Sequence, residues 1–160
     1  PANDETGLVT LIVMDNTGNP ASLELCESIY NHIMRPDSPY ERLAPINANL
    51  KVMAPKAVPI NVQVKVFLEE NYDNPPIDKF KANLIEYFKN LTNNTIRKNE
   101  ILAVLINTEG ILNYAAEQIS ATVDNQIVNY ATLYFSKYKL KPGEMPAVGK
   151  ISMEQLTEEL

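Results

Sequence analysis

The sequence predicts an α+β protein made of two small α/β layers, each with helices on one face of a mainly antiparallel sheet. Two patterns predict this class. In residues 58–68, valine, isoleucine and leucine alternate with other side chains, which is the two-residue period of a strand. Residues 77–91 instead carry apolar side chains at helical spacing. An Ala-Pro-Lys break divides the chain into a first subdomain, residues 1–54, and a second, residues 55–160.

The first subdomain is expected to fold as strand, helix and strand. Residues 8–14, LVTLIVM, are a short apolar run that predicts a buried strand, and turn formers follow it. A helix comes next, with Asn19 as its expected N-cap and Pro20 in its first turn. Prolines stop it near Arg35. Its expected apolar face consists of Leu23, Cys26, Tyr30 and Ile33.

A loop and two strands are expected to follow. Residues 36–47 predict the loop, and residues 49–54 predict a short strand that ends at a proline. The alternation in residues 58–68 predicts a strand with one buried and one mostly wet face. Pro59 cannot donate a ladder hydrogen bond, which favours an edge or a strand-end position.

The remainder of the second subdomain predicts helices and then strands. The apolar pattern of residues 77–91 predicts one helix, and residues 98–106 predict a shorter one, with Gly110 as a stop. Residues 111–119 predict a strand, whereas the fold of residues 120–146 stays open. The segments expected near the C-terminus are a possible strand at 127–135, a turn at 141–143, a strand at 148–153 and an acidic tail at 154–160.

Charge and hydropathy exclude two classes of partner. The formal net charge is -6, and the 14 Lys and Arg residues are scattered along the chain. A nucleic acid or an anionic membrane surface would need clustered basic residues, so neither partner is expected. No apolar run approaches the roughly 18 residues of a membrane span, so no membrane insertion is expected. The polar start at Pro1, without a methionine, is expected of a segment of a longer protein.

Residues with catalytic potential are few. Cys26 is the only cysteine and His32 the only histidine, which excludes an intrachain disulfide and a Cys/His zinc site. Cys26 lies on the apolar helix face and is expected to be a buried, inert thiol. His32 lies far from that face and is expected to be solvated. The acidic groups expected to be solvated are Glu69, Glu70 and Asp73, with Glu154, Glu158 and Glu159.

These observations predict no enzyme. There is no glycine-rich phosphate loop and no nucleophile elbow in the sequence. We therefore expect no catalytic residue, no metal, no cofactor and no small-molecule substrate. Tyr130, Tyr134 and Tyr138 recur at four-residue spacing, and tyrosine is enriched at protein interfaces. Either these three side chains form a contact surface or they are half-buried amphipathic residues, and both interpretations stay open.

The order of several uncommon segments carries a resemblance. The segments are residues 8–15 with TGNPAS at 17–22, Tyr30 with IMRPDSP at 33–39, ERLAPINA at 41–48, Ala54-Pro55 with VPIN at 58–61, and AVL at 103–105 with NTEG at 107–110. In this order they resemble the C-terminal part of baseplate proteins of the phage Mu protein J family. Versions in contractile-tail phages and in PBSX-type defective prophages of Gram-positive bacteria are the most similar. The resemblance covers residues 7–119 and is most specific over 35–61.

The resemblance implies a structural role. Such proteins form part of the wedge of a contractile-tail baseplate and act by protein–protein contacts. Their partners are other wedge and hub proteins and possibly further copies of themselves. They are made in the bacterial cytoplasm and function in the tail baseplate. The family has no catalytic residues to carry over. Residues 120–149 depart from the family because they are poor in glycine. The alternative function is that of a tail-associated adaptor that contacts a host surface or a fibre protein.

Overall fold

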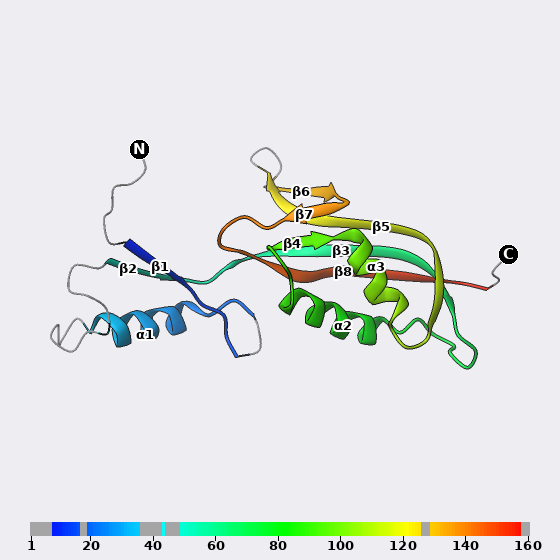
Figure 1. Ribbon diagram of the computed structural model, residues 1–160, viewed down its shortest axis with the longest axis horizontal. Helices are drawn as coiled ribbons and strands as arrows, with labels where there is room; N and C mark the ends of the chain where they lie inside the picture. Colours follow the sequence, from blue (N-terminus) through cyan, green and yellow to red (C-terminus); the bar gives the residue numbers. More distant parts are fainter. Residues whose placement is uncertain (1–7, 17–18, 36–42, 44–48, 126–128, 158–160) are drawn as a thin grey trace. The chain divides into compact units, whose positions relative to one another are not determined.

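The structure, a computed structural model, describes residues 8–16, 19–35, 43, 49–125 and 129–157. The chain divides into two compact units, Pro1–Lys56 and Ala57–Leu160, called unit 1 and unit 2 below. The expected α+β class is confirmed. In chain order the elements are β1 Leu8–Ile12, α1 Leu23–Met34, β2 Asn49–Met53, β3 Lys56–Leu68, α2 Ile77–Lys89, β4 Thr95–Arg97, α3 Lys98–Ile106, β5 Ile111–Asn125, β6 Asn129–Tyr134, β7 Lys137–Lys139 and β8 Glu144–Leu156 (Figure 1).

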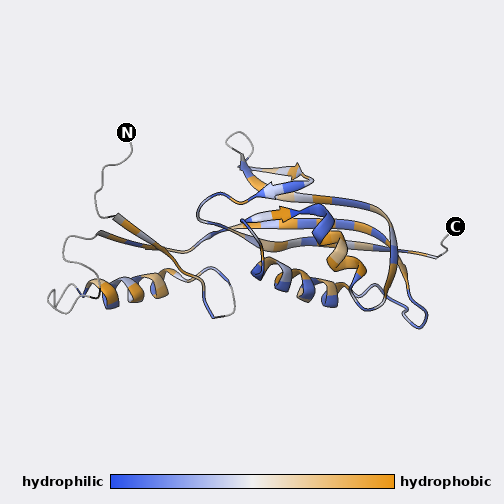
Figure 2. Ribbon diagram, in the orientation of Figure 1, coloured by the Kyte–Doolittle hydropathy of each residue, from blue (hydrophilic) through white to orange (hydrophobic). Residues whose placement is uncertain are grey.

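Unit 1 is a β-α-β arrangement, as predicted, but the burial predicted for its first strand is wrong, because Val9 and Ile12 are 53% and 44% exposed. β1 and β2 pair in parallel, with Leu11 beside Val52, and α1 packs against β2. Parallel neighbours cannot be joined by a tight hairpin, so the helical crossover between them is required. Hydrophobic residues follow one another along β1 (Figure 2). The loop predicted for residues 36–47 lies outside the described residues, apart from Leu43.

The start of α1 differs from the prediction. The N-cap is Ser22, whose hydroxyl accepts a hydrogen bond from the Leu25 N–H at 3.1 Å. Asn19 instead closes a turn with Asp15, since the Asp15 N–H donates to the Asn19 carbonyl at 2.7 Å. The Ala21 N–H then donates to the Val13 carbonyl at 3.1 Å. The backbone therefore stays paired with the preceding strand through Ala21, and the helix cannot begin at Pro20.

The buried face of α1 also differs from the predicted stripe. Cys26 and Met34 are buried, whereas Leu23 is 75% exposed and Tyr30 is 36% exposed. The predicted stripe is therefore correct at Cys26 and wrong at Leu23 and Tyr30. A two-stranded sheet is too narrow to cover all of it. Arg35 ends the helix at the expected place, with φ 45° and its N–H donating to the Asn31 carbonyl at 2.9 Å.

Unit 2 is built on a four-stranded sheet in the order β6-β5-β3-β8. β5 is antiparallel to both β3 and β6. Two contacts show the relative direction of β3 and β8. Asn61 accepts a hydrogen bond from the Lys150 N–H, and four residues further along each strand Lys65 Nζ lies 3.8 Å from a Glu154 carboxylate oxygen. β8 is therefore parallel to β3, which makes a mixed sheet with two antiparallel pairs.

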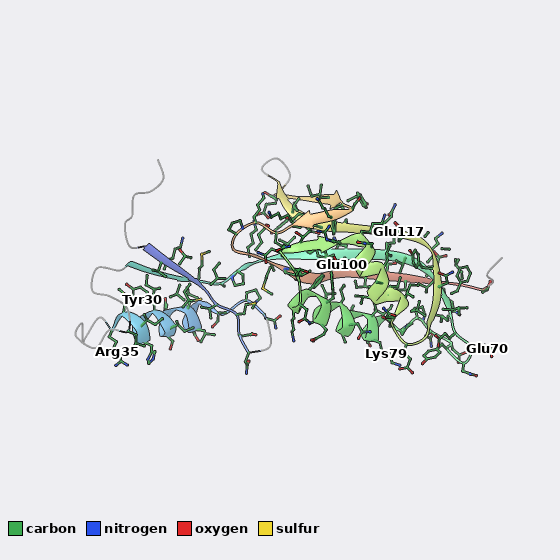
Figure 3. The ribbon with its side chains drawn as sticks, in the orientation of Figure 1. Tyr30, Arg35, Glu70, Lys79, Glu100 and Glu117 are labelled. Atoms are coloured by element: carbon green, nitrogen blue, oxygen red, sulfur yellow. The ribbon has the colours of Figure 1, made fainter. Side chains whose placement is uncertain are left out.

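The core of unit 2 lies between this sheet and its two helices. The even-numbered residues of β3 from Val58 to Val66 are all buried, and the predicted buried face is confirmed. Phe80 and Leu84 of α2 and Ile101 of α3 are fully buried in the same core. Both helices therefore cover one face of the sheet. Lys98, at the start of α3, forms an ion pair with Glu117 of β5, and Figure 3 labels this glutamate.

Pro59 lies within β3, which is an inner strand of the sheet and not an edge. The strand-end alternative holds, because the ladder with β5 begins at Ile60. Pro59 therefore does not interrupt this ladder.

The C-terminal part of the chain is richer in strands than expected. β5 continues past residue 119 to Asn125, and β6 falls within the possible strand at 127–135. β8 includes Glu154, so the acidic tail predicted from that residue is wrong for the strand portion. The short strands β4 and β7 pair with each other and were not predicted.

Candidate functional site

Among the described residues of unit 2, both helices pack on one face of the sheet and none on the other, which we call the open face. On β3 it displays Asn61, Gln63 and Lys65, because their even-numbered neighbours point into the core. The register with β5 places Ser120 beside Asn61 and Gln118 beside Gln63. Amide, hydroxyl and amino groups therefore line the open face at these positions.

Two of the three predicted contact tyrosines extend the open face onto β6. Tyr134 pairs with Ser120, so the two side chains project to the same side of the sheet. Tyr130 lies four residues earlier in the same strand and shares that side. Their exposed fractions are 64% and 68%, respectively. Both rings are thus available for contact at the edge of the open face.

The third tyrosine does not belong to this surface. Tyr138 is on β7, pairs with Ile96 of β4 and is buried. Its ring centroid lies 5.8 Å from that of Phe135, and its O–H donates to a Glu144 carboxylate oxygen at 3.4 Å. Burial, followed by the nearby Glu144 charge, raises the pKa of the Tyr138 phenol above 10.0. Four-residue spacing does not group the tyrosines, because the chain leaves β6 after Tyr134.

Asn61 connects three strands on the open face. Its amide N–H groups donate to the Thr122 hydroxyl at 3.0 Å and to the Ser120 hydroxyl at 3.4 Å. Its Oδ1 accepts the backbone N–H of Lys150 at 2.9 Å. A side chain on Gly149 would collide with this Oδ1 and with the Ile60 carbonyl, so the close approach requires glycine.

The open face contains a shallow groove of about 360 Å³. Its lining includes Asn61, Gln63, Gln118, Thr132, Tyr134 and Lys150. The Asn61 hydrogen bonds fix one side chain of this lining, and Tyr134 supplies an aromatic ring. These groups can donate and accept hydrogen bonds and offer one aromatic surface, which suits the recognition of a binding partner.

A second depression, of about 440 Å³, lies between α2 and α3. Tyr87 in its wall accepts a hydrogen bond from the Arg97 N–H at 3.2 Å, and burial raises the pKa of this phenol above 10.0. Asn83 donates to the Thr108 hydroxyl at 3.3 Å, and that hydroxyl donates to the Val104 carbonyl at 2.8 Å. The hydrogen bonds of Thr108 tie α2 to the end of α3. The polar groups around this depression therefore have a structural role.

A cluster that the sequence did not indicate joins two loops of unit 2. The Tyr72 O–H donates to Glu109 Oε1 at 2.7 Å, and Lys79 Nζ lies 3.4 Å from Glu109 Oε2. The hydrogen bond from Tyr72, followed by Lys79, lowers the pKa of Glu109 below 4.5. The same bond raises the pKa of Tyr72 above 10.0. Gly110, with φ 100°, leaves room for the Tyr72 ring.

The residues with catalytic potential are dispersed. His32 is exposed on α1 and Cys26 is buried on the same helix, as predicted. Glu69, Glu70 and Asp73 are exposed, whereas Glu158 and Glu159 lie outside the described residues. In the part of the chain that the structure describes, no three His, Cys, Asp or Glu side chains are grouped as a metal site would require.

Comparison of the sequence with models of protein families and with curated proteins finds no match. Among the helices of the described segments, none has the length and apolarity needed to cross a membrane.

Proposed function

We propose that this protein is a structural component of the tail baseplate of a contractile phage or phage-like particle, acting by protein–protein contacts in the wedge. The observation that carries the proposal is the order of uncommon segments over residues 35–61, which resembles the protein J family. The segment ends at Asn61, whose side chain joins β3, β5 and β8. Asn61 belongs to the segment that resembles the family and holds three strands together, which suits a structural role.

Exposed surfaces of the protein also support a role in contacts. Along β1, the exposed fractions of Val9, Leu11 and Ile12 are 53%, 36% and 44%. Exposed apolar residues in neighbouring positions are typical of surfaces that bind other proteins. Parallel strands are commonly buried on both faces, so β1 has the composition of a strand that a neighbour covers.

The proposed mechanism is mechanical. It would be a rearrangement of wedge-to-wedge interfaces, in which rigid parts move relative to one another and the moving part makes no covalent bond. Unit 2 has the properties of a rigid part, because one continuous core connects β3, α2 and α3. Its partners would be other wedge and hub proteins of the same baseplate.

The experiment is deletion of the coding region in the source bacterium, followed by electron microscopy of induced particles. The wedge role predicts tails without a complete baseplate, restored when the wild-type protein is supplied. Normal baseplates in the deletion strain would contradict the proposal.

The second candidate is a tail-associated adaptor that contacts a host surface or a fibre protein. The exposure of Tyr130 and Tyr134 at the edge of the open face favours it. The double variant Tyr130→Ala/Tyr134→Ala separates the two candidates. The adaptor role predicts intact particles that no longer bind cells, whereas the wedge role predicts defective assembly or no effect on cell binding.

A further inference from the structure

The sheet of unit 2 ends in two edge strands that differ in their protection. β8 contains Pro146, Lys150 and Glu154, and α2 packs against it. Proline, charges and a covering helix are the usual means by which proteins prevent an edge from pairing with another strand. β6, with the sequence NYATLY, contains no proline and no charged residue. β6 is therefore the edge that is open to pairing.

The backbone of β6 has a defined set of groups facing this edge. The Phe135 N–H donates to the Ile119 carbonyl at 3.4 Å, just beyond the end of the β5–β6 ladder. Hydrogen-bonded and non-hydrogen-bonded pairs alternate along an antiparallel ladder. Odd-numbered residues of β6 therefore bond to β5. The N–H and C=O groups of Tyr130, Thr132 and Tyr134 point to the free edge.

We propose that β6 pairs antiparallel with β6 of a second copy of this chain, with the two-fold axis at Thr132. This register uses the outward backbone groups of all three residues, in both copies. Tyr130 then lies opposite the partner's Tyr134, and Leu133 lies opposite the partner's Ala131. Cross-strand aromatic pairs of this kind stabilise sheets beyond the area that they bury.

A second copy fits this edge for reasons of symmetry and charge. An isologous contact requires a surface that is complementary to itself. The sequence around Thr132 meets this condition, with a tyrosine two residues away on either side. No like charges meet in the pairing, although the net charge of the chain is -6. The product is a continuous sheet across both copies.

The pairing deepens the proposed function by naming one surface and one partner of the wedge, and it rests on that function for its biological meaning. The geometric argument concerns unit 2 alone and can be tested in solution. The outcome for the dimer and the outcome for the particle are therefore separable.

The first experiment measures the mass of the chain by size-exclusion chromatography with light scattering over a wide range of concentration. The wild-type chain is expected to shift from 17.9 kDa to twice this mass as concentration rises. Thr132→Lys places two like charges at the axis and is expected to weaken dimerisation several-fold. Ser152→Lys, an exposed residue of β8 on the open face, is the matched control and should dimerise normally.

The second experiment tests the register by cross-linking. Hydrogen-bonded antiparallel pairs have Cα atoms about 5.5 Å apart, a distance that a disulfide can span. In a Cys26→Ala background, Thr132→Cys is expected to form a covalent dimer on mild oxidation, and Ser152→Cys is not. Circular dichroism confirms that each variant is folded.

Three results would overturn the pairing. They are a wild-type chain that stays monomeric at the highest concentration, a dimer that Thr132→Lys leaves intact, or equal cross-linking at residues 132 and 152. A monomer in solution would leave the baseplate location open to its own test in particles.

Discussion

At the scale of single residues, Asn61 is the connection on which the open face depends. Its Oδ1 accepts the Lys150 N–H, and its amide reaches the Thr122 hydroxyl. Asn61→Ala leaves the Lys150 N–H without its partner and removes the partly buried hydrogen bonds to the Thr122 and Ser120 hydroxyls, so it is expected to lower the free energy of unfolding by roughly 1–3 kcal/mol. Chemical denaturation monitored by circular dichroism measures this loss.

The matched control for Asn61 is Gln63, two residues along β3 on the same face. Gln63 is exposed, so Gln63→Ala is expected to change the free energy of unfolding by no more than about 0.5 kcal/mol. Equal effects of the two substitutions would show that Asn61 has no special role in joining β8 to β3.

Substitutions at Gly110 and Gly143 distinguish two destabilising effects of an added side chain, which are backbone strain and steric overlap. Both have positive φ, at 100° and 83°. A Cβ on Gly110 would lie 2.7 Å from Tyr72 Cδ1, whereas one on Gly143 would have no atom within 4 Å. Gly143→Ala is expected to cost about 1 kcal/mol for backbone strain alone, and Gly110→Ala more. Thermal unfolding of both variants checks the order, and a smaller loss for Gly110→Ala would contradict the contact.

The Tyr72–Glu109 hydrogen bond predicts a pH dependence with a definite sign. The pKa of Glu109 is lowered by folding, so its contribution is present above about 4.5, the ordinary value, and is lost as pH falls through the folded pKa. The pKa of Tyr72 is raised, so its contribution is lost as pH rises through a value above 10.0.

Tyr72→Phe tests this prediction by removing the donor. The pKa of Glu109, followed by nuclear magnetic resonance, is expected to rise towards 4.5, and the variant's stability should fall less than the wild type's between pH 5 and pH 3. An unchanged Glu109 titration in the variant would contradict the assignment.

At the scale of elements, α2 is held by one apolar face. Phe80, Leu84 and Phe88 recur at four-residue spacing and are all buried. Leu84→Ala is expected to cost about 2–5 kcal/mol, because it removes a fully buried side chain and leaves a cavity. Ile85, the next residue, is 45% exposed, and Ile85→Ala should cost well below this amount. Comparable losses would contradict the packing of α2 onto β3.

Elements with a regular apolar pattern could be predicted from the sequence. The alternation of β3 and the spacing of α2 found these elements, because burial on one face imposes a period on the residues. The start of α1 was missed because Asn19 and Pro20 are good helix starters and equally good turn formers, and pairing with Val13 decided between these alternatives. Local propensity cannot distinguish them.

The candidate site was harder to predict than the fold. Tyr130 and Tyr134 were identified by residue type, but Tyr138 was grouped with them only by spacing, and its place in β7 depends on pairing with a distant strand. Asn61 was part of the predicted strand, yet its bonds reach Thr122 and Lys150, far away in the sequence. The contact partners of such residues depend on topology and not on a local pattern.

At the scale of the whole molecule, the protein combines two units that each offer a surface for contact. Unit 1 exposes the apolar strand β1, and unit 2 exposes the tyrosines of β6. The described residues include no cluster that would bind a metal. A protein with several contact surfaces suits a place in an assembly, where it would meet more than one neighbour.

The central claim is that this protein is a part of the baseplate, and its position in the particle tests the claim most directly. The measurement is immunogold electron microscopy of particles released after induction of the source bacterium, with an antibody raised against this chain. Label confined to the plate below the sheath is the predicted result. Contractile particles that carry no label at the tail end would contradict the claim.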